Sequence, residues 1–122
     1  DMVQDVLDTM TEPAIKGTGQ FSIGELASAM KRCDCLVTND SGPMHVGVSQ
    51  GVPIVALYGP SNPALYGPFT DNAIVLESME HYDVNKNMKQ VLKEGNYKGL
   101  SVISEESVLA GVRTMLDRKG MN

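Results

Sequence analysis

The sequence predicts an α/β fold, a parallel sheet with helices on both of its faces. Short apolar stretches alternate with stretches in which apolar residues recur at helical spacing. Short turns rich in glycine connect them, and residues 53–58 are apolar on both faces, as a central parallel strand is. This alternation is typical of successive β-α-β units, whose strands share one parallel sheet.

The first third of the chain predicts two helices with a brief strand between them. Residues 2–10 carry apolar side chains at helical spacing, so we expect the chain to open within an amphipathic helix. Residues 14–15 are a short apolar piece before a loop, and we expect a strand there. A second helix begins at Ser22, which forms a capping box with Glu25, and it ends near Lys31.

The middle of the chain predicts the sheet. Residues 35–38 form a compact apolar strand, residues 39–42 a turn, and residues 43–50 a short helix with proline at its start. Strands follow at residues 53–58 and 73–76, separated by a loop rich in glycine and proline over residues 59–71. Because ligands bind at the carboxyl ends of parallel strands, the turn and this loop are the two candidate binding segments.

The last part of the chain is less patterned. Residues 77–100 are polar, with one helix expected around residues 84–92. Ser104 then caps a final helix. We expect its inward face to carry Val108, Leu109, Val112 and Leu116.

Composition restricts the possible partners and the compartment. The 122 residues carry a net charge of −5, from 15 acidic against 10 basic residues, which argues against nucleic acid as a partner. An anionic nucleotide remains possible because backbone amides can hold phosphate.

Two cysteines one residue apart are unsuited to a disulfide, and no membrane span or signal peptide is evident, so we expect a cytoplasmic protein. The chain starts without an initiator Met, so we expect a single truncated domain, residues 1–122, of a longer protein.

The segment NDSGPMH, residues 39–45, is a candidate anion site. It joins a buried strand to a helix, whose first turn has unpaired N–H groups and a positive dipole end. Ser41, Gly42 and Met44 can offer backbone N–H donors, whereas Pro43 has none. Gly42 also lets a ligand approach the backbone closely, because it has no Cβ.

Asp40 and His45 flank these donors. A carboxylate beside phosphate repels it, so Asp40 should face other groups, such as sugar hydroxyls. His45 and Ser49 share a helical face that differs from the face packed on the sheet. Each residue also has a structural interpretation, Asp40 as a turn residue and His45 as a surface histidine. Nucleophile-elbow, Walker A and dinucleotide-binding glycine motifs are absent from the sequence.

A longer stretch resembles a known family. The string NDSGPMHVGVSQGVPIVALYGPSNPALYGPF is similar to the signature of glycosyltransferase family 9, the ADP-heptose–lipopolysaccharide heptosyltransferases. Members carry D-[ST]-G-x-x-H, then a G-V-P strand, then a G-P-[ST]-x-P loop. The upstream segment FSIGELASAMKRCDCLVTND and the terminal segment ISEESVLAGVRTML also fit. The resemblance implies the GT-B architecture of two Rossmann-like domains, of which this chain would be part of the carboxyl-terminal, donor-binding one.

The resemblance also implies roles for individual residues. Asp40 would bind the transferred heptose, Ser41 and Gly42 would hold the diphosphate, and His45 would lie beside the diphosphate or the sugar. Phe21 matches a position that packs near the nucleotide base. Asp1 falls roughly where the family has an acidic residue for the ribose, but we assign it no role.

The reaction implied by the resemblance is inverting transfer of heptose from a nucleoside diphosphate, ADP-heptose, to the lipopolysaccharide core. No cofactor or metal is expected, and no D-x-D metal signature is present. The base, an Asp in the family, and the acceptor site belong to the amino-terminal domain, so no catalytic residue is expected in this chain. The parent enzyme would work at the cytoplasmic face of the inner membrane.

Two other function classes stay open. One is a non-catalytic nucleotide-sugar-binding domain that kept the anion-binding loop but lost transfer. The other is a sugar-nucleotide epimerase-like enzyme, which would need catalytic acids on both sides of its cleft. The exact nucleotide and sugar also stay open, because residues 77–100 lack a cysteine-containing pattern found in many family members.

Overall fold

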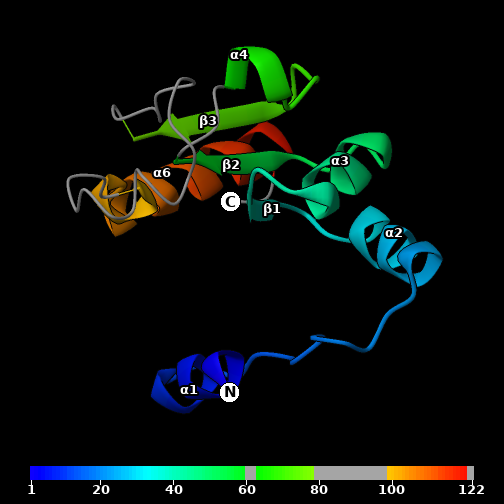
Figure 1. Ribbon diagram of the computed structural model, residues 1–122, viewed down its shortest axis with the longest axis vertical. Coiled ribbons are helices and arrows are strands. Elements are labelled where there is room, and N and C mark those ends of the chain that lie inside the picture. The colour runs from blue at the N-terminus through cyan, green and yellow to red at the C-terminus, as the bar shows by residue number, and fades with distance from the viewer. Residues whose placement is uncertain (60–62, 79–98, 121–122) are drawn as a thin grey trace, which may run out of the picture.

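A computed structural model describes residues 1–59, 63–78 and 99–120. Along the chain the elements follow the order α1, α2, β1, α3, β2, α4, β3, a 3-10 helix and α6 (Figure 1). The helix expected around residues 84–92 lies outside the described residues. Within the described part, no helix combines the length and the apolar character that a bilayer-spanning helix needs.

Helix α1, Met2–Thr9, lies apart from the sheet (Figure 1). Its N-cap is Asp1, whose carboxylate accepts the N–H of Val3 at 2.9 Å. The helix expected over residues 2–10 is therefore confirmed, and Asp1 caps its first turn. The apolar face of α1 is exposed to solvent, with Met2 and Val6 82% and 56% exposed.

The strand expected at residues 14–15 does not form. Residues 13–17 have no regular secondary structure, and Ile15 is 99% exposed. A strand needs a neighbouring strand for its backbone hydrogen bonds, and each described strand pairs elsewhere. Residues 10–22 instead lead as an irregular segment from α1 to α2.

Helix α2, Ile23–Lys31, starts with the predicted capping box. The Ser22 hydroxyl accepts the N–H of Glu25 at 3.2 Å, and the Glu25 carboxylate accepts the N–H of Ser22 at 3.1 Å. The hydrogen bond from the Ser22 N–H, and second the Ser22 hydroxyl, lower the pKa of Glu25, because they stabilise its charged carboxylate. Met30, near the end of α2, is buried where α2 packs beside α3.

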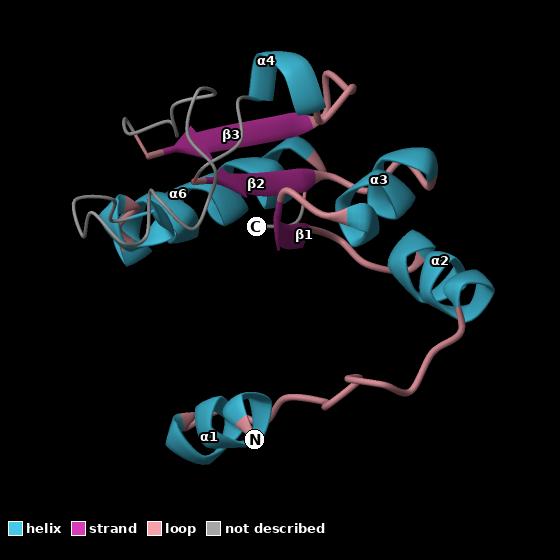
Figure 2. Ribbon diagram, viewed as in Figure 1, coloured by secondary structure: helices cyan, strands magenta, loops and turns pink. Residues whose placement is uncertain are grey.

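The three described strands form the predicted parallel sheet. β1 (Leu36–Asn39), β2 (Ile54–Tyr58) and β3 (Ala73–Glu77) lie in the order β1-β2-β3 (Figure 2). Leu57 of β2 is paired with Asn39 on one side and with Leu76 on the other. β2 is therefore the central strand, and all three carboxyl ends lie at one edge of the sheet.

Helices cover both faces of β2, as predicted. On one face, Ile54, Ala56 and Tyr58 form a buried core with Met44 of α3 (Gly42–Ser49). On the other face, Val55 lies against Gly111 of α6, Glu105–Arg118. Successive strand residues point to opposite faces, so a strand with apolar residues throughout has to be covered on both sides.

Helix α6 begins at the predicted cap, where the Ser104 hydroxyl accepts the N–H of Ser107 at 3.1 Å. The prediction that Leu109 faces inward is wrong, because it is 53% exposed. The buried residues are Gly111 and Met115, which share one helical stripe with Val108 and Val112. Two short elements complete the described fold, α4 (Pro63–Tyr66) and the 3-10 helix (Gly99–Val102).

Candidate functional site

The loop between β1 and α3 lies at the carboxyl-terminal edge of the sheet. Ser41 is the N-cap of α3 and has an extended backbone, with φ −159° and ψ 170°. Its side chain does not cap the helix, and its hydroxyl donates to the Asn39 carbonyl oxygen at 3.4 Å. Serine at this position usually accepts a first-turn N–H. Here no N–H group in the first turn of α3 donates to the Ser41 hydroxyl.

The backbone N–H groups of this loop fall into two classes. The Met44 N–H donates to the Ser41 carbonyl oxygen at 3.1 Å, and a role of this amide toward a diphosphate stays a prediction. The Met44 side chain is fully buried in the core. Within residues 1–59, 63–78 and 99–120, the N–H groups of Ser41 and Gly42 donate to no protein group. Two adjacent unpaired donors at the positive end of a helix suit an anion.

Gly42 leaves the space beside these donors open. A Cβ built at Gly42 would have no heavy atom within 4 Å, and the residue is exposed. In the part of the chain that the structure describes, no side chain therefore occupies the space that a Cβ on Gly42 would enter. This openness agrees with the prediction that a ligand approaches the Gly42 backbone, although the residue roles themselves remain predictions.

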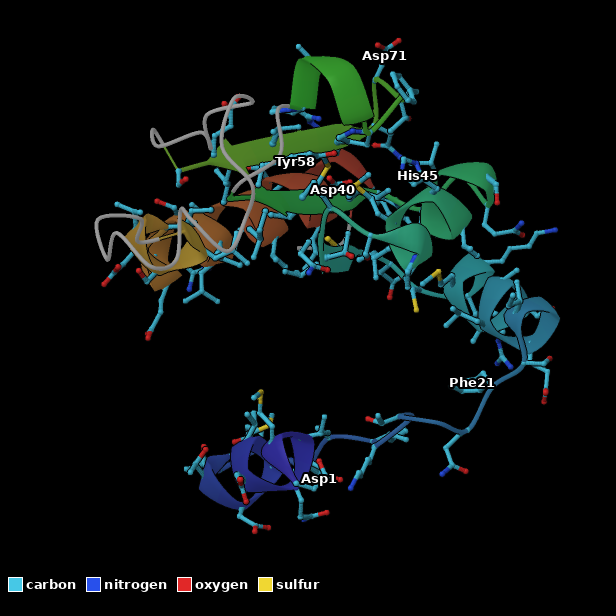
Figure 3. All side chains as sticks on the ribbon, viewed as in Figure 1. Asp1, Phe21, Asp40, His45, Tyr58 and Asp71 are labelled. Carbon is cyan, nitrogen blue, oxygen red and sulfur yellow. The ribbon has the colours of Figure 1, made fainter. Side chains whose placement is uncertain are left out.

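Asp40 lies half-buried between β1 and these donors, near Tyr58 (Figure 3). Burial, and second the Asp40 carboxylate, raise the pKa of Tyr58 to about 12. In the described part of the chain, the carboxylate has no hydrogen-bond or ion-pair partner. Asp40 is not the N-cap of α3, a position that Ser41 occupies. Its carboxylate can therefore accept hydrogen bonds from a ligand.

His45 and Ser49 are exposed on α3, as their helical spacing predicts. The opposite stripe of this helix carries Met44 and Gly47, which are buried against the sheet. The Ser49 hydroxyl donates to the Val46 carbonyl oxygen of its own helix at 2.6 Å. Of the two exposed side chains, His45 is the one in the first turns of α3 and so the closer to Gly42.

Phe21 and Asp1 are not brought to this loop. Figure 3 shows Phe21 on the segment before α2 and Asp1 on α1, both apart from Asp40 and His45. The Phe21 ring lies against Gly17, and its side chain is 48% exposed. Asp1 caps α1 and pairs with Lys16 at 2.9 Å. The role of Phe21 toward a nucleotide base stays a prediction.

The structure adds Tyr58 to the candidate site, which the sequence reasoning treated only as part of a strand. Tyr58 is fully buried at the carboxyl end of β2. Its hydroxyl donates to the Gly67 carbonyl oxygen and lies 3.4 Å from the sulfur of Met44. A phenol hydroxyl inside an otherwise apolar strand was the available signal, since a buried tyrosine requires a polar partner.

The sequence matches the model of a known family over most of its length. A family model described as glycosyltransferase family 9 (heptosyltransferase) matches residues 2–98. The chain belongs to glycosyltransferase family 9. The family resemblance of the residue 39–69 string is thereby confirmed.

Individual family 9 proteins match over most of this chain but over a small part of their own length. Lipopolysaccharide heptosyltransferase 2 of Salmonella typhimurium is 32% identical over 103 residues, covering 84% of this chain and 29% of that protein. Its counterpart in Escherichia coli K12 is 34% identical over 98 residues, covering 80% and 28%. The chain therefore spans less than a third of these relatives.

Two solved family 9 structures share the fold. The glycosyl transferase family 9 protein of Veillonella parvula has a TM-score of 0.86 and 61% identity, covering 96% of this chain and 33% of that one. The Escherichia coli ADP-heptose lipopolysaccharide heptosyltransferase II has a TM-score of 0.66 and 29% identity, covering 85% and 28%. The predicted fold class, a Rossmann-like part of a GT-B glycosyltransferase, is confirmed.

Proposed function

We propose that this chain is the donor-binding part of a glycosyltransferase that transfers heptose from ADP-heptose to the lipopolysaccharide core. Membership of family 9 and the similarity to lipopolysaccharide heptosyltransferases support this reaction class. The observation that carries the donor role is the pair of adjacent amides at the start of α3, Ser41 and Gly42, which donate to no group among the described residues.

The two amides would hold the diphosphate of the donor. Their N–H groups and the helix dipole provide positive potential without a basic side chain. A chain of net charge −5 can therefore bind an anion at this point. As the glycosidic bond breaks, the leaving diphosphate gains negative charge. Donors already oriented toward that position stabilise the charge without reorganising. In this proposal they take the role that a metal ion has in other glycosyltransferases, so no cofactor is required.

Asp40 and His45 would contact the groups on either side of the diphosphate. The Asp40 carboxylate repels phosphate, so it accepts hydrogen bonds from hydroxyls of the transferred sugar. The exposed His45 ring can donate an N–H to the diphosphate. Both residues remain available to a ligand from outside, since neither side chain is buried in the core.

We assign no general base to this chain. In the proposal, the base and the acceptor site belong to the rest of a family 9 protein, of which this chain spans less than a third. The chain alone would then bind donor without transferring sugar at a measurable rate. We place the whole enzyme in the cytoplasm, at the inner membrane where the lipopolysaccharide core is built.

Replacing Asp40 tests the sugar-facing role. Asp40→Ala should leave the affinity for ADP unchanged or slightly higher, because a repulsive charge is lost. The affinity for ADP-heptose should fall by about tenfold or more, the factor expected for one hydrogen bond to a charged group. Isothermal titration calorimetry with both ligands measures the difference.

Asp71→Ala is the matched control for this experiment. Asp71 is exposed and precedes β3, whose Ala73 pairs with Ile54 at the start of β2. Although Asp71 ends the loop of residues 59–71, it therefore lies at the amino-terminal edge of the sheet, opposite Asp40 and away from the carboxyl-terminal edge proposed to bind the donor, and it carries the same charge. Its removal should change neither affinity. Equal losses of ADP and ADP-heptose in Asp40→Ala would count against a sugar contact.

A further inference from the structure

The side chain of Tyr58 connects two loops at the carboxyl edge of the sheet. The tyrosine is fully buried at the end of β2, and its hydroxyl donates to the carbonyl oxygen of Gly67. Gly67 is itself buried and lies in the segment that follows α4. The segment after β2 is thus held to the sheet by a side-chain hydrogen bond.

The same hydroxyl also contacts the first turn of α3. It lies 3.4 Å from the sulfur of Met44, which is fully buried. Met44 in turn donates its N–H to the Ser41 carbonyl oxygen at 3.1 Å. One phenol group therefore contacts both Met44, in the first turn of α3, and the Gly67 carbonyl oxygen of the neighbouring loop.

These two loops follow neighbouring parallel strands, β1 and β2, at the sheet edge where ligands of such folds bind. A ligand as long as a nucleoside diphosphate sugar would contact both. A small anion would contact the α3 amides alone. The spacing between the loops therefore matters for the long ligand and not for the short one.

We propose that Tyr58 is a positioning residue of the donor site, fixing the loop at Gly67 against the first turn of α3 at the spacing that a nucleoside diphosphate sugar requires. This inference rests on the proposed donor-binding function. Tyr58 does not touch the donor, because its side chain is fully buried. It acts through Gly67 and Met44.

The test compares a long and a short ligand in the whole chain. Tyr58→Phe keeps the ring and removes only the hydroxyl. The affinity for ADP-heptose should fall about fivefold, the factor for one neutral hydrogen bond. The affinity for inorganic phosphate, followed by the amide chemical shifts of Ser41 and Gly42, should change by less than about 1.5-fold. The ratio of the two affinities is a readout that general destabilisation does not move.

Two further variants keep the test decisive. Gly67→Ala perturbs the same contact from the loop side, because Gly67 has a φ of +91° and a Cβ there would lie 3.1 Å from the Phe69 nitrogen. It should reproduce the selective loss of ADP-heptose. Val55→Ala destabilises the opposite face of the same strand, under α6, and should leave both affinities unchanged.

The outcomes separate this inference from the proposed function. If the unmodified chain binds neither ADP-heptose nor phosphate, the donor-binding function fails, and the role of Tyr58 fails with it. If the unmodified chain binds both but Tyr58→Phe binds ADP-heptose equally well, only the positioning role is overturned. A parallel loss of both ligands, or an equal loss in Val55→Ala, would show that Tyr58 merely stabilises the fold.

Discussion

Replacing Gly42 by alanine should separate folding from binding in this chain. A Cβ at Gly42 meets no heavy atom within 4 Å, and its φ is not in the left-handed region. Gly42→Ala should therefore leave the fold intact. It should raise the free energy of unfolding by about 0.4–1 kcal/mol, because alanine restricts the unfolded chain more than glycine does. Thermal melting monitored by circular dichroism measures this change.

The same methyl group should obstruct a ligand on the Gly42 backbone. A diphosphate that accepts the Gly42 N–H would meet the new Cβ and lose a hydrogen bond to a charged group, which is worth about 1.5–3 kcal/mol. We therefore expect the affinity for ADP to fall by roughly tenfold to a hundredfold in calorimetric titrations. A more stable protein with weaker binding is the specific signature of this site.

Gly24→Ala is the control for that experiment. Gly24 lies in the first turn of α2, and a Cβ there also has no heavy atom within 4 Å. The substitution should raise stability by a similar amount and leave ADP binding unchanged. If Gly42→Ala binds ADP as tightly as the unmodified chain does, the ligand does not approach the Gly42 backbone.

Two further predictions concern the sheet. At Gly111 of α6, a Cβ would lie 3.2 and 3.3 Å from the two methyl carbons of the buried, β-branched Val55. Gly111→Ala should therefore lower the free energy of unfolding by about 1 kcal/mol, after the gain from the higher helix propensity of alanine is included. An equal or higher free energy of unfolding in urea would contradict this close packing. Because the folded-state pKa of Tyr58 is raised from 10.0 to about 12, the fold favours the protonated phenol. Its contribution to stability should be complete below pH 10 and lost as the pH rises toward about 12. Between pH 9 and pH 11, the free energy of unfolding should fall less for Tyr58→Phe than for the unmodified chain. An equal fall in both proteins would contradict the raised pKa of Tyr58.

The sequence predicted the sheet because its pattern was unambiguous there. Residues 53–58 are apolar on both faces, which only a covered central strand explains, and β2 has that position. The capping box at Ser22 and the cap at Ser104 were predictable because capping depends on residues adjacent in the chain.

Predictions that depend on distant partners were less successful. Residues 14–15 resemble a strand, but strand formation requires a neighbour, and local sequence does not show whether one is present. Leu109 was expected in the core because it is apolar. The buried stripe of α6 instead passes through Gly111, whose small size permits close contact with Val55.

The candidate site was predictable in its location but not in its details. The strand-turn-helix order placed Asp40 through Gly42 at the carboxyl-terminal edge of the sheet, where folds of this class bind ligands. Pattern alone could not show that the Met44 N–H is taken by the Ser41 carbonyl, because that depends on the local backbone geometry of the helix start. Nor could it show that Tyr58 reaches Gly67, nine residues further along the chain.

In the proposed donor site, an anionic diphosphate binds the Ser41 and Gly42 N–H groups at the start of α3. Titrating the isotope-labelled chain with ADP, with the backbone amide chemical shifts as the readout, measures this contact at each residue. We expect the largest saturable shifts at the Ser41 and Gly42 N–H groups and much smaller ones at Gly24, which also lies at a helix start. Shifts at Gly24 as large as those at Gly42, or no saturable shift at Ser41 and Gly42, would contradict this contact.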